Sequence, residues 1–145
     1  MEALREQKKQ QILEAALKVF AKRGFDGATV SMIAEEAGIA KGLLYTYYEN
    51  KEELLKQIIR FGMEKAIATL VNDGKPVRIK TKADFAAELR KMLRQILQQP
   101  DFWRLYMMVL LQSHTTAMVQ QQMGAFLEQY LNVDLSYFKR KKSSN

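Results

Sequence analysis

Cysteine is absent from this sequence of 145 residues, and histidine occurs only once. A disulfide framework, a thiol nucleophile and a structural zinc site are excluded, because each needs residues that the chain does not have. The longest apolar run, residues 105–111, is far shorter than the ~20 residues that span a bilayer. The first ten residues, MEALREQKKQ, mix both charges and lack the apolar core of a signal peptide. We therefore expect a soluble cytoplasmic protein without a metal site, a cofactor or a membrane partner.

The net charge of +7 is unevenly distributed along the chain. Residues 1–58 carry nine Lys and Arg against nine Asp and Glu, whereas the remaining residues carry fourteen against seven. The excess of positive charge lies mainly in residues 75–94 and 139–142. The simplest interpretation of these residues is a set of solvated helix faces and a basic tail. Net charge alone therefore does not locate a site for nucleic acid.

Apolar residues recur at helical spacing, and no stretch alternates as a strand would. In the first half we expect helices over residues 3–23, 30–37, 41–48 and 51–71. Their boundaries are indicated by Gly24 and Gly38 as helix ends and by Thr29 and Asn50 as N-caps.

A breaker cluster at residues 72–76, Asn-Asp-Gly-Lys-Pro, predicts a loop between two parts of the chain. Thr81 followed by Asp84 resembles a capping signal for a helix that ends before Pro100. The apolar stripe of this helix consists of Phe85, Leu89, Leu93, Ile96 and Leu97. Two further helices are expected over residues 101–112 and 115–137, so the fold class is all-α.

Two short helices joined by the tight turn at residues 38–40 form a helix-turn-helix pattern, in which the second helix enters the DNA major groove. The residues around it make the pattern specific. From Ile12 to Leu55 the sequence resembles the TetR family of bacterial repressors, most closely in the segment AGIAKGLLYTYYENKEELL. The resemblance covers about a third of the chain.

The resemblance implies roles for individual residues in DNA binding. Lys41, Gly42 and Leu43 would face base edges, and an apolar Leu43 would contact a thymine methyl group. The remaining expected contacts are with the sugar-phosphate backbone and come from Thr29, Tyr45, Tyr47 and Lys51. Ala40 departs from the family pattern, because it provides no side-chain N-cap for the recognition helix. Tyr48 is expected to pack inward.

The resemblance also implies an N-terminal three-helix DNA-binding domain, residues 1–50, followed by a helical effector-binding and dimerisation domain, residues 51–145. The second domain is expected to be incomplete relative to the family. The function implied is that of a repressor that binds double-stranded operator DNA as a homodimer and is released by a small molecule. The expected effector pocket is apolar and contains Phe61, Phe85, Trp103, Met107, His114 and Met118.

Three other interpretations compete with that of a repressor. An enzyme is not expected, because the paired glutamates 35–36 and 52–53 lie at exposed helix starts and do not converge on one site. The sequence also does not pair a nucleophilic side chain with a general base, so no catalytic residue is predicted. A helical interaction module does not account for residues 41–55. A third interpretation, a truncated relic that no longer binds DNA, stays open.

We also expect self-association through an apolar strip on the last helix, drawn from Val119, Met123, Phe126, Tyr130 and Leu131.

Overall fold

The computed structural model describes residues 1–68, 71–72, 75–112 and 115–131. Within these residues seven helices carry the fold, as expected for an all-α protein. In chain order they are α1 Glu2–Arg23, α2 Val30–Ala37, α3 Lys41–Tyr45, α4 Lys51–Ile67, α5 Lys82–Gln98, α6 Pro100–Leu110 and α7 Thr116–Leu131. Two strands of two residues, β1 Val71–Asn72 and β2 Lys75–Pro76, pair antiparallel between α4 and α5.

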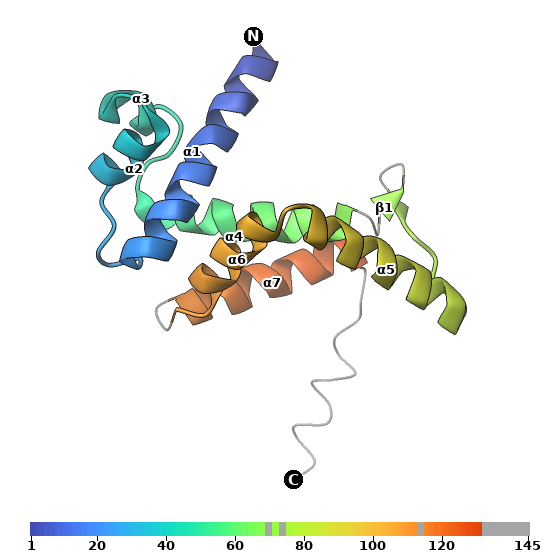
Figure 1. Ribbon diagram of the computed structural model, residues 1–145. Helices are drawn as coiled ribbons and strands as arrows, with labels where there is room; N and C mark the ends of the chain where they lie inside the picture. Colours follow the sequence, from blue (N-terminus) through green and yellow to red (C-terminus); the bar gives the residue numbers. More distant parts are fainter. Residues whose placement is uncertain (69–70, 73–74, 113–114, 132–145) are drawn as a thin grey trace.

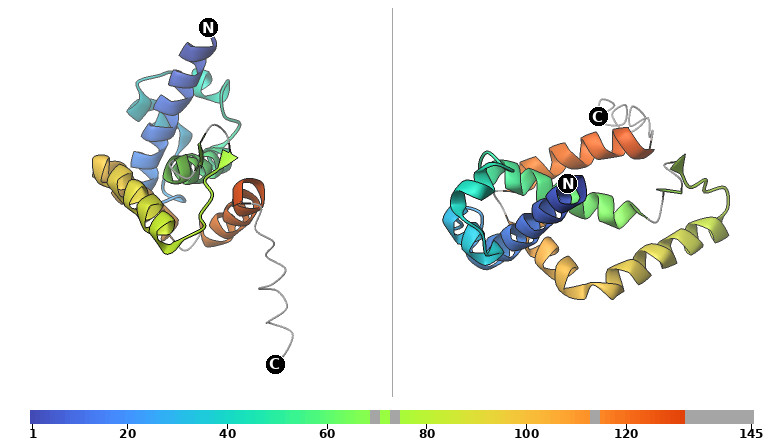
Figure 2. Two further views of the ribbon diagram at one scale, coloured as in Figure 1. Left: turned by 90° about the vertical axis from the view of Figure 1, so that its right-hand side faces the viewer. Right: turned by 90° about the horizontal axis from the view of Figure 1, so that it is seen from above.

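The helices form two groups that share α1 and α4. Helices α2 and α3 lie beside α1 at one end of the molecule, and α4 to α7 make up the other end (Figure 1). Seen from above, α4 runs between α7 on one side and the α5–α6 pair on the other (Figure 2). Helix α4 therefore connects the helix-turn-helix to the C-terminal helices.

The core forms where α1 meets α4. Ile12, Ala16 and Phe20 on one face of α1 are completely buried, as are Leu54 and Ile59 on α4. The four-residue spacing of these α1 residues agrees with the helical recurrence of apolar residues in the sequence. Burying large aliphatic and aromatic side chains contributes roughly 1.5–3 kcal/mol each, so this contact stabilises the junction of α1 and α4.

Helix α3 is shorter than the predicted helix over residues 41–48. It ends at Tyr45, and the Thr46 hydroxyl donates a hydrogen bond to the Leu43 carbonyl oxygen at 2.7 Å. Tyr47 and Tyr48 follow in a turn whose amides both donate to Leu44 O. Competition of a threonine side chain for a main-chain carbonyl explains the early end.

Helix α4 also ends before the predicted boundary at residue 71. Its last residue is Ile67, because Val71 pairs with Pro76 and Asn72 with Lys75 in the small hairpin. An extended strand requires backbone angles that a helix does not have. The predicted loop at residues 72–76 is therefore partly this hairpin, a feature that the sequence pattern missed.

The orientation of α5 differs from the predicted one. Glu88 is buried, with 6% of its surface exposed, whereas four of the five residues of the predicted stripe are exposed: Phe85 57%, Leu89 39%, Leu93 47% and Leu97 76%. The fifth, Ile96, is partly buried against the core. The start of α5 agrees with the prediction, because Thr81 and Asp84 form a capping box.

The predicted apolar strip on the last helix is only partly present. Met123 is 45% exposed, but Phe126 is buried with 6% exposure, since α7 packs against α4. The side chains of Tyr130 and Leu131, and the predicted continuation over residues 132–137, lie outside the described residues. Among the described helices, none is long and apolar enough to cross a membrane.

Candidate nucleic-acid interface

The turn between α2 and α3 is built by Gly38. Its φ of 66° and ψ of 34° are left-handed, a conformation that glycine adopts at little cost. The Gly38 amide donates to Glu35 O and the Ile39 amide to Ala34 O, each at 3.0 Å, which is the hydrogen-bond pattern of a Schellman motif. At the other end of α2, the Thr29 hydroxyl oxygen accepts from the Met32 amide at 3.1 Å, as the sequence predicts. These contacts fix the start of α2 and the turn that leads into α3.

Helix α3 has one buried and one exposed face. Leu44 is completely buried and anchors the helix, whereas Lys41 and Gly42 are exposed and Leu43 and Tyr45 are 41% and 46% exposed. An added Cβ atom at Gly42 would meet nothing within 4 Å. The fold itself therefore does not require glycine there. As predicted, Ala40 provides no side-chain cap.

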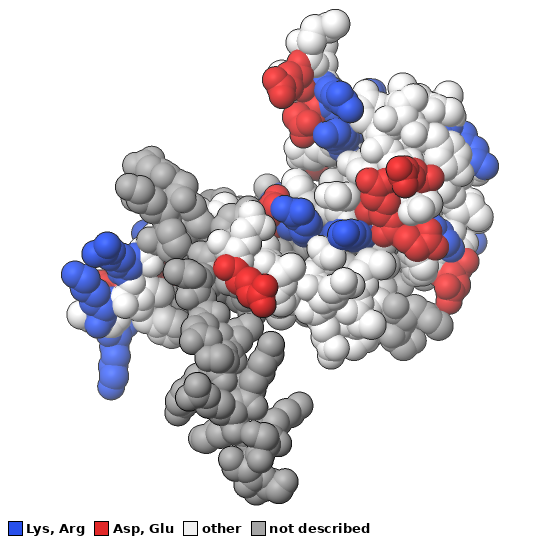
Figure 3. Space-filling model, turned by 180° about the vertical axis from the view of Figure 1, so that it is seen from behind, with Lys and Arg blue, Asp and Glu red and all other residues white. Residues whose placement is uncertain are grey.

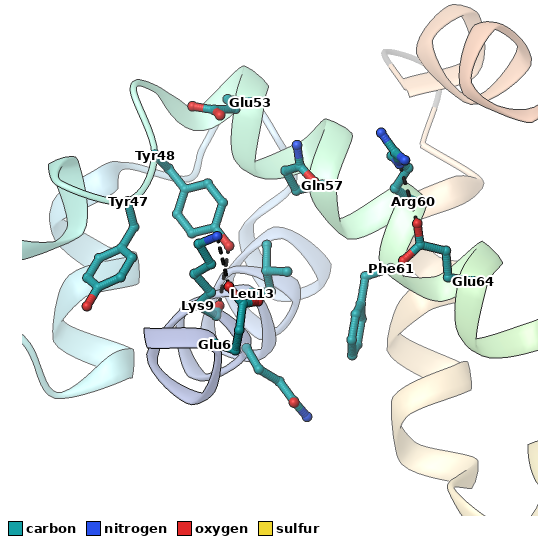
Figure 4. A pocket seen from close by; sticks show the side chains of 11 residues that line it. Glu6, Lys9, Leu13, Tyr47, Tyr48, Glu53, Gln57, Arg60, Phe61 and Glu64 are labelled. Carbon is teal, nitrogen blue, oxygen red and sulfur yellow. Dashed lines mark hydrogen bonds and ion pairs between the residues drawn. The ribbon is translucent and has the colours of Figure 1, made fainter. Parts of the chain in front are cut away.

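Tyr47 and Tyr48 point in different directions after α3 (Figure 4). Tyr48 is buried on α1, with its hydroxyl donating to the Lys9 carbonyl oxygen at 3.4 Å, which agrees with the prediction that it packs inward. Burial, followed by the negative charges of Glu53 and Glu6, raises the pKa of Tyr48 to about 12. Tyr47 is half-buried.

Both tyrosines line a polar cavity of about 480 Å³ between α1 and α4. Charged groups of both signs surround it, among them Lys9 and Arg60 together with Glu6 and Glu64. The exposed residues of α3 do not belong to its lining.

Lys51 is the first residue of α4, and its ammonium faces the loop between α1 and α2. Its Nζ donates to Phe25 O at 2.8 Å, to Ala28 O at 3.2 Å and to Asp26 O at 3.4 Å, and lies 4.5 Å from the Phe25 ring centroid. The expected phosphate contact of Lys51 stays a prediction, and its ammonium would have to leave these three carbonyl oxygens to make that contact. The helix terminus itself is capped as predicted, with Glu53 N donating to Asn50 Oδ1 at 2.8 Å.

Charge does not mark the DNA-binding face by itself. Seen from behind, Lys and Arg gather at the outer end of α5, whereas the N-terminal helices carry both signs (Figure 3). The Lys18 to Glu36 pair, 3.9 Å apart, is an example of the mixed surface between α1 and α2. The position of α3 is therefore the stronger indication of an interface.

The predicted effector residues are only partly brought together. Trp103 is buried and Phe61 and Met118 are half-buried, but Phe85 and Met107 are 57% and 48% exposed. His114 lies outside the described residues. Instead, Phe61 and Trp103 join an aromatic cluster with Phe102 and Tyr106, in which neighbouring ring centroids are 5.1 to 5.9 Å apart.

Two glutamines that the sequence does not single out make contacts between elements. Gln11 on α1 donates to Ala37 O at 2.6 Å and so fixes the end of α2. Gln112, after α6, bonds to the end of α1. Their partners are main-chain atoms, which no side-chain motif reveals.

The fold and the exposed second helix of the pair define the class: an all-α protein with an N-terminal helix-turn-helix. Residues 12–58 match the family model described as bacterial regulatory proteins, tetR family. The match covers the helix-turn-helix and the start of α4, so this segment of the chain is similar to the DNA-binding part of the TetR family.

Curated relatives and solved structures agree with this assignment. The chain is 34% identical over 101 residues to the uncharacterized HTH-type transcriptional regulator YuxN of Bacillus subtilis, covering 66% of this chain and 33% of that protein. It is 29% identical over 123 residues to the fatty acid metabolism regulator protein of Bacillus subtilis, covering 85% of this chain and 62% of that protein. It therefore spans between one third and two thirds of the length of these relatives.

Among solved structures, a TetR-like transcriptional regulator from Rhodococcus sp. RHA1 has a TM-score of 0.60 at 29% identity, with 81% of this chain and 62% of that one covered. The fatty acid degradation regulator FadR of Bacillus halodurans has a TM-score of 0.62 at 26% identity, with 86% and 62% covered. The similarity therefore extends beyond the helix-turn-helix into the C-terminal helices.

Proposed function

We propose that this protein is a transcriptional regulator that binds double-stranded operator DNA with α3 in the major groove. The observation that carries the proposal is the exposed face of α3, which lies directly after the left-handed turn at Gly38 and is anchored by buried Leu44. A helix held in this way can be inserted as a rigid unit, so its side chains reach base edges in a fixed register.

The proposed DNA contacts divide into two sets. Lys41, Gly42 and Leu43 read base edges, Leu43 by contact with a thymine methyl group. The remaining residues hold the sugar-phosphate backbone: Thr29, Tyr45, Tyr47 and Lys51. For Lys51 we assign this role to its main-chain amide at the start of α4, where free amides favour a phosphate. Its ammonium stays on the loop carbonyls.

Residues 51–145 would form the effector-binding and dimerisation part, and residues 1–50 the DNA-binding part. The proposed effector is a small apolar molecule whose binding releases the operator. The aromatic cluster beside α4 supports this, as does the buried Trp103 indole N–H, a donor without a partner among the described residues. In this proposal the ligand enters through a cavity of about 460 Å³ that is lined by Phe102 and Lys65. Two relatives are named as fatty acid regulators, which also favours an apolar ligand.

The proposed working form is a cytoplasmic homodimer, in which two α3 helices read half-sites about 34 Å apart. Selection of duplexes from a random pool by the full chain tests the function. We expect one shared sequence motif to be enriched and its binding to weaken as salt rises. A pool that stays random would contradict operator binding and would favour a helical interaction module or a relic.

A further inference from the structure

The Phe25 peptide lies where the N-terminal and C-terminal groups of helices meet. Its amide donates to Gln112 Oε1 at 3.1 Å, and its carbonyl oxygen accepts from Lys51 Nζ at 2.8 Å. The Phe25 ring packs back on α1, with its centroid 5.5 Å from that of Phe20. One residue is thus held from the end of α6 and from the beginning of α4.

The Gln112 side chain uses both ends of its amide group. While Oε1 accepts from Phe25, Nε2 donates to Phe20 O at 2.9 Å, a carbonyl at the C-terminal end of α1. Both bonds are partly buried, so water competes weakly for them. A residue after α6 therefore closes the end of a helix that lies about ninety residues earlier in the chain.

The main chain of Gln112 is itself fixed. The Thr115 hydroxyl is completely buried and lies within hydrogen-bonding distance of Gln112 O at 2.7 Å and Val109 O at 2.9 Å. The Thr115 amide also donates to Gln112 O, at 3.0 Å. The Gln112 carbonyl oxygen at the end of α6 is thus held by both the hydroxyl and the amide of Thr115.

The segment that Gln112 holds leads directly into the helix-turn-helix. Four residues after Phe25 comes Thr29, the N-cap of α2, whose carbonyl oxygen accepts from the amide of buried Ile33. Since α2 and α3 are joined by the fixed turn at Gly38, a displacement of the loop before Thr29 displaces both helices together.

We infer that Gln112 is a positioning residue for DNA binding, which ties the orientation of α2 and α3 to the C-terminal end of α6. The inference rests on the proposed function and adds a mechanical route to it. A ligand that shifts α6 would move or break the Gln112 contacts, and so would change the angle at which α3 meets DNA.

Two substitutions separate this role from general stability. Gln112→Met keeps the length of the side chain and removes both hydrogen bonds. Gln112→Glu keeps the acceptor for the Phe25 amide but places a carboxylate against Phe20 O. The matched control is Gln95→Met, a glutamine on α5 whose Oε1 makes no hydrogen bond among the described residues.

Binding of the full-length variants is compared on the duplex enriched from the random pool and on a random duplex of equal length. We expect Gln112→Met to weaken binding to the enriched duplex by roughly two- to thirtyfold. Binding to random duplex should not change, because it depends on phosphate charge and Gln112 is neutral. Gln112→Glu should show a partial or equal loss, and Gln95→Met none.

Hydrogen exchange provides the second readout. In Gln112→Met we expect faster exchange at the Phe25 amide and also at the Ile33 amide in α2. Faster exchange at Phe25 alone, with wild-type DNA binding, would overturn the inference and leave Gln112 as a helix cap. Equal losses on both duplexes with lower stability would overturn it as well. If the wild type binds neither duplex, the proposed function fails, and the inference then depends on hydrogen exchange alone. Faster exchange at the Ile33 amide in Gln112→Met supports the connection between Gln112 and α2, and exchange at the wild-type rate refutes it.

Discussion

Tyr106 on α6 donates its hydroxyl hydrogen to the Ile59 carbonyl oxygen of α4 at 2.7 Å, and its ring lies directly over Gly62. The hydroxyl and the ring of Tyr106 thus contact two residues of α4, Ile59 and Gly62, that lie within one helical turn of each other. Burial raises the pKa of Tyr106 well above its ordinary value, which keeps the donor protonated. This contact fixes α6, and with it Gln112, relative to the helix that begins at Lys51.

The close approach at Gly62 predicts an unusual response to alanine. Gly→Ala inside a helix normally stabilises by up to about 1 kcal/mol. At Gly62 the new methyl group would overlap the Tyr106 ring, so we expect Gly62→Ala to lower the free energy of unfolding by roughly 1–3 kcal/mol. Gly124→Ala in α7 is the control, because its methyl group would meet nothing within 4 Å. Urea unfolding that gives both variants the same sign of change would contradict the contact.

The two buried tyrosines predict a loss of stability at alkaline pH. The pKa of Tyr48 is about 12 in the folded protein against 10.0 as its ordinary value, and that of Tyr106 is also raised. Because the folded pKa values are higher, their contribution is complete below about pH 10 and is lost as pH rises toward 12 and beyond. In a pH titration followed by tyrosinate absorbance, the folded protein should show a phase at high pH from these two phenols. Its amplitude should fall by one phenol in Tyr48→Phe and by one phenol in Tyr106→Phe. Denatured protein should lack this phase, and a native titration identical to the denatured one would argue against burial of both rings.

Lys51 is expected to act on stability more than on the salt dependence of DNA binding. Lys51→Met removes a charged donor from three loop carbonyl oxygens, so the free energy of unfolding should fall by roughly 1–3 kcal/mol. The slope of log affinity against log salt should stay nearly unchanged. Lys56→Met, at an exposed position on the same helix, is the control and should leave stability unchanged. A slope that decreases by about one unit at wild-type stability would place the ammonium on a phosphate instead.

The exposed stripe on α5 is the surface that we expect to drive self-association. Leu93→Glu should shift the sedimentation coefficient toward that of a monomer at micromolar concentration, because it places a charge within the apolar stripe. Leu4→Glu is the matched control, since Leu4 is 68% exposed on α1, away from the stripe. Wild-type protein that sediments as a monomer throughout this range would refute the expected dimer.

Local signals in the sequence predict the helix boundaries well where the deciding atoms are close in the chain. Thr81 with Asp84 forms the expected capping box, and Gly38 forms the expected turn. Where a boundary depends on competition between bonds, as at Thr46, the apolar pattern predicts too long a helix. The early end of α4 has a similar origin, because Val71 is used in pairing.

Contacts between distant parts of the chain are harder to predict. Periodicity identifies the stripe of Leu89 and Leu93 on α5 but not its rotation, which the packing of the other helices determines. Gln112 has no pattern at all, because its partners are two main-chain atoms near residue 20. The turn at Gly38 and the helix that follows it are predictable from a local motif, whereas the position of the Lys51 ammonium depends on contacts with a distant loop.

The placement of α3 in the major groove can be tested at Gly42. A methyl group at Gly42 meets open space in the free protein, so Gly42→Ala should keep or slightly raise the free energy of unfolding. In the complex the same methyl group would face base edges. Binding to the duplex enriched by the wild type should therefore weaken roughly tenfold or more, while random duplex is bound as before. Wild-type affinity and sequence preference in Gly42→Ala would contradict the placement of α3 in the major groove.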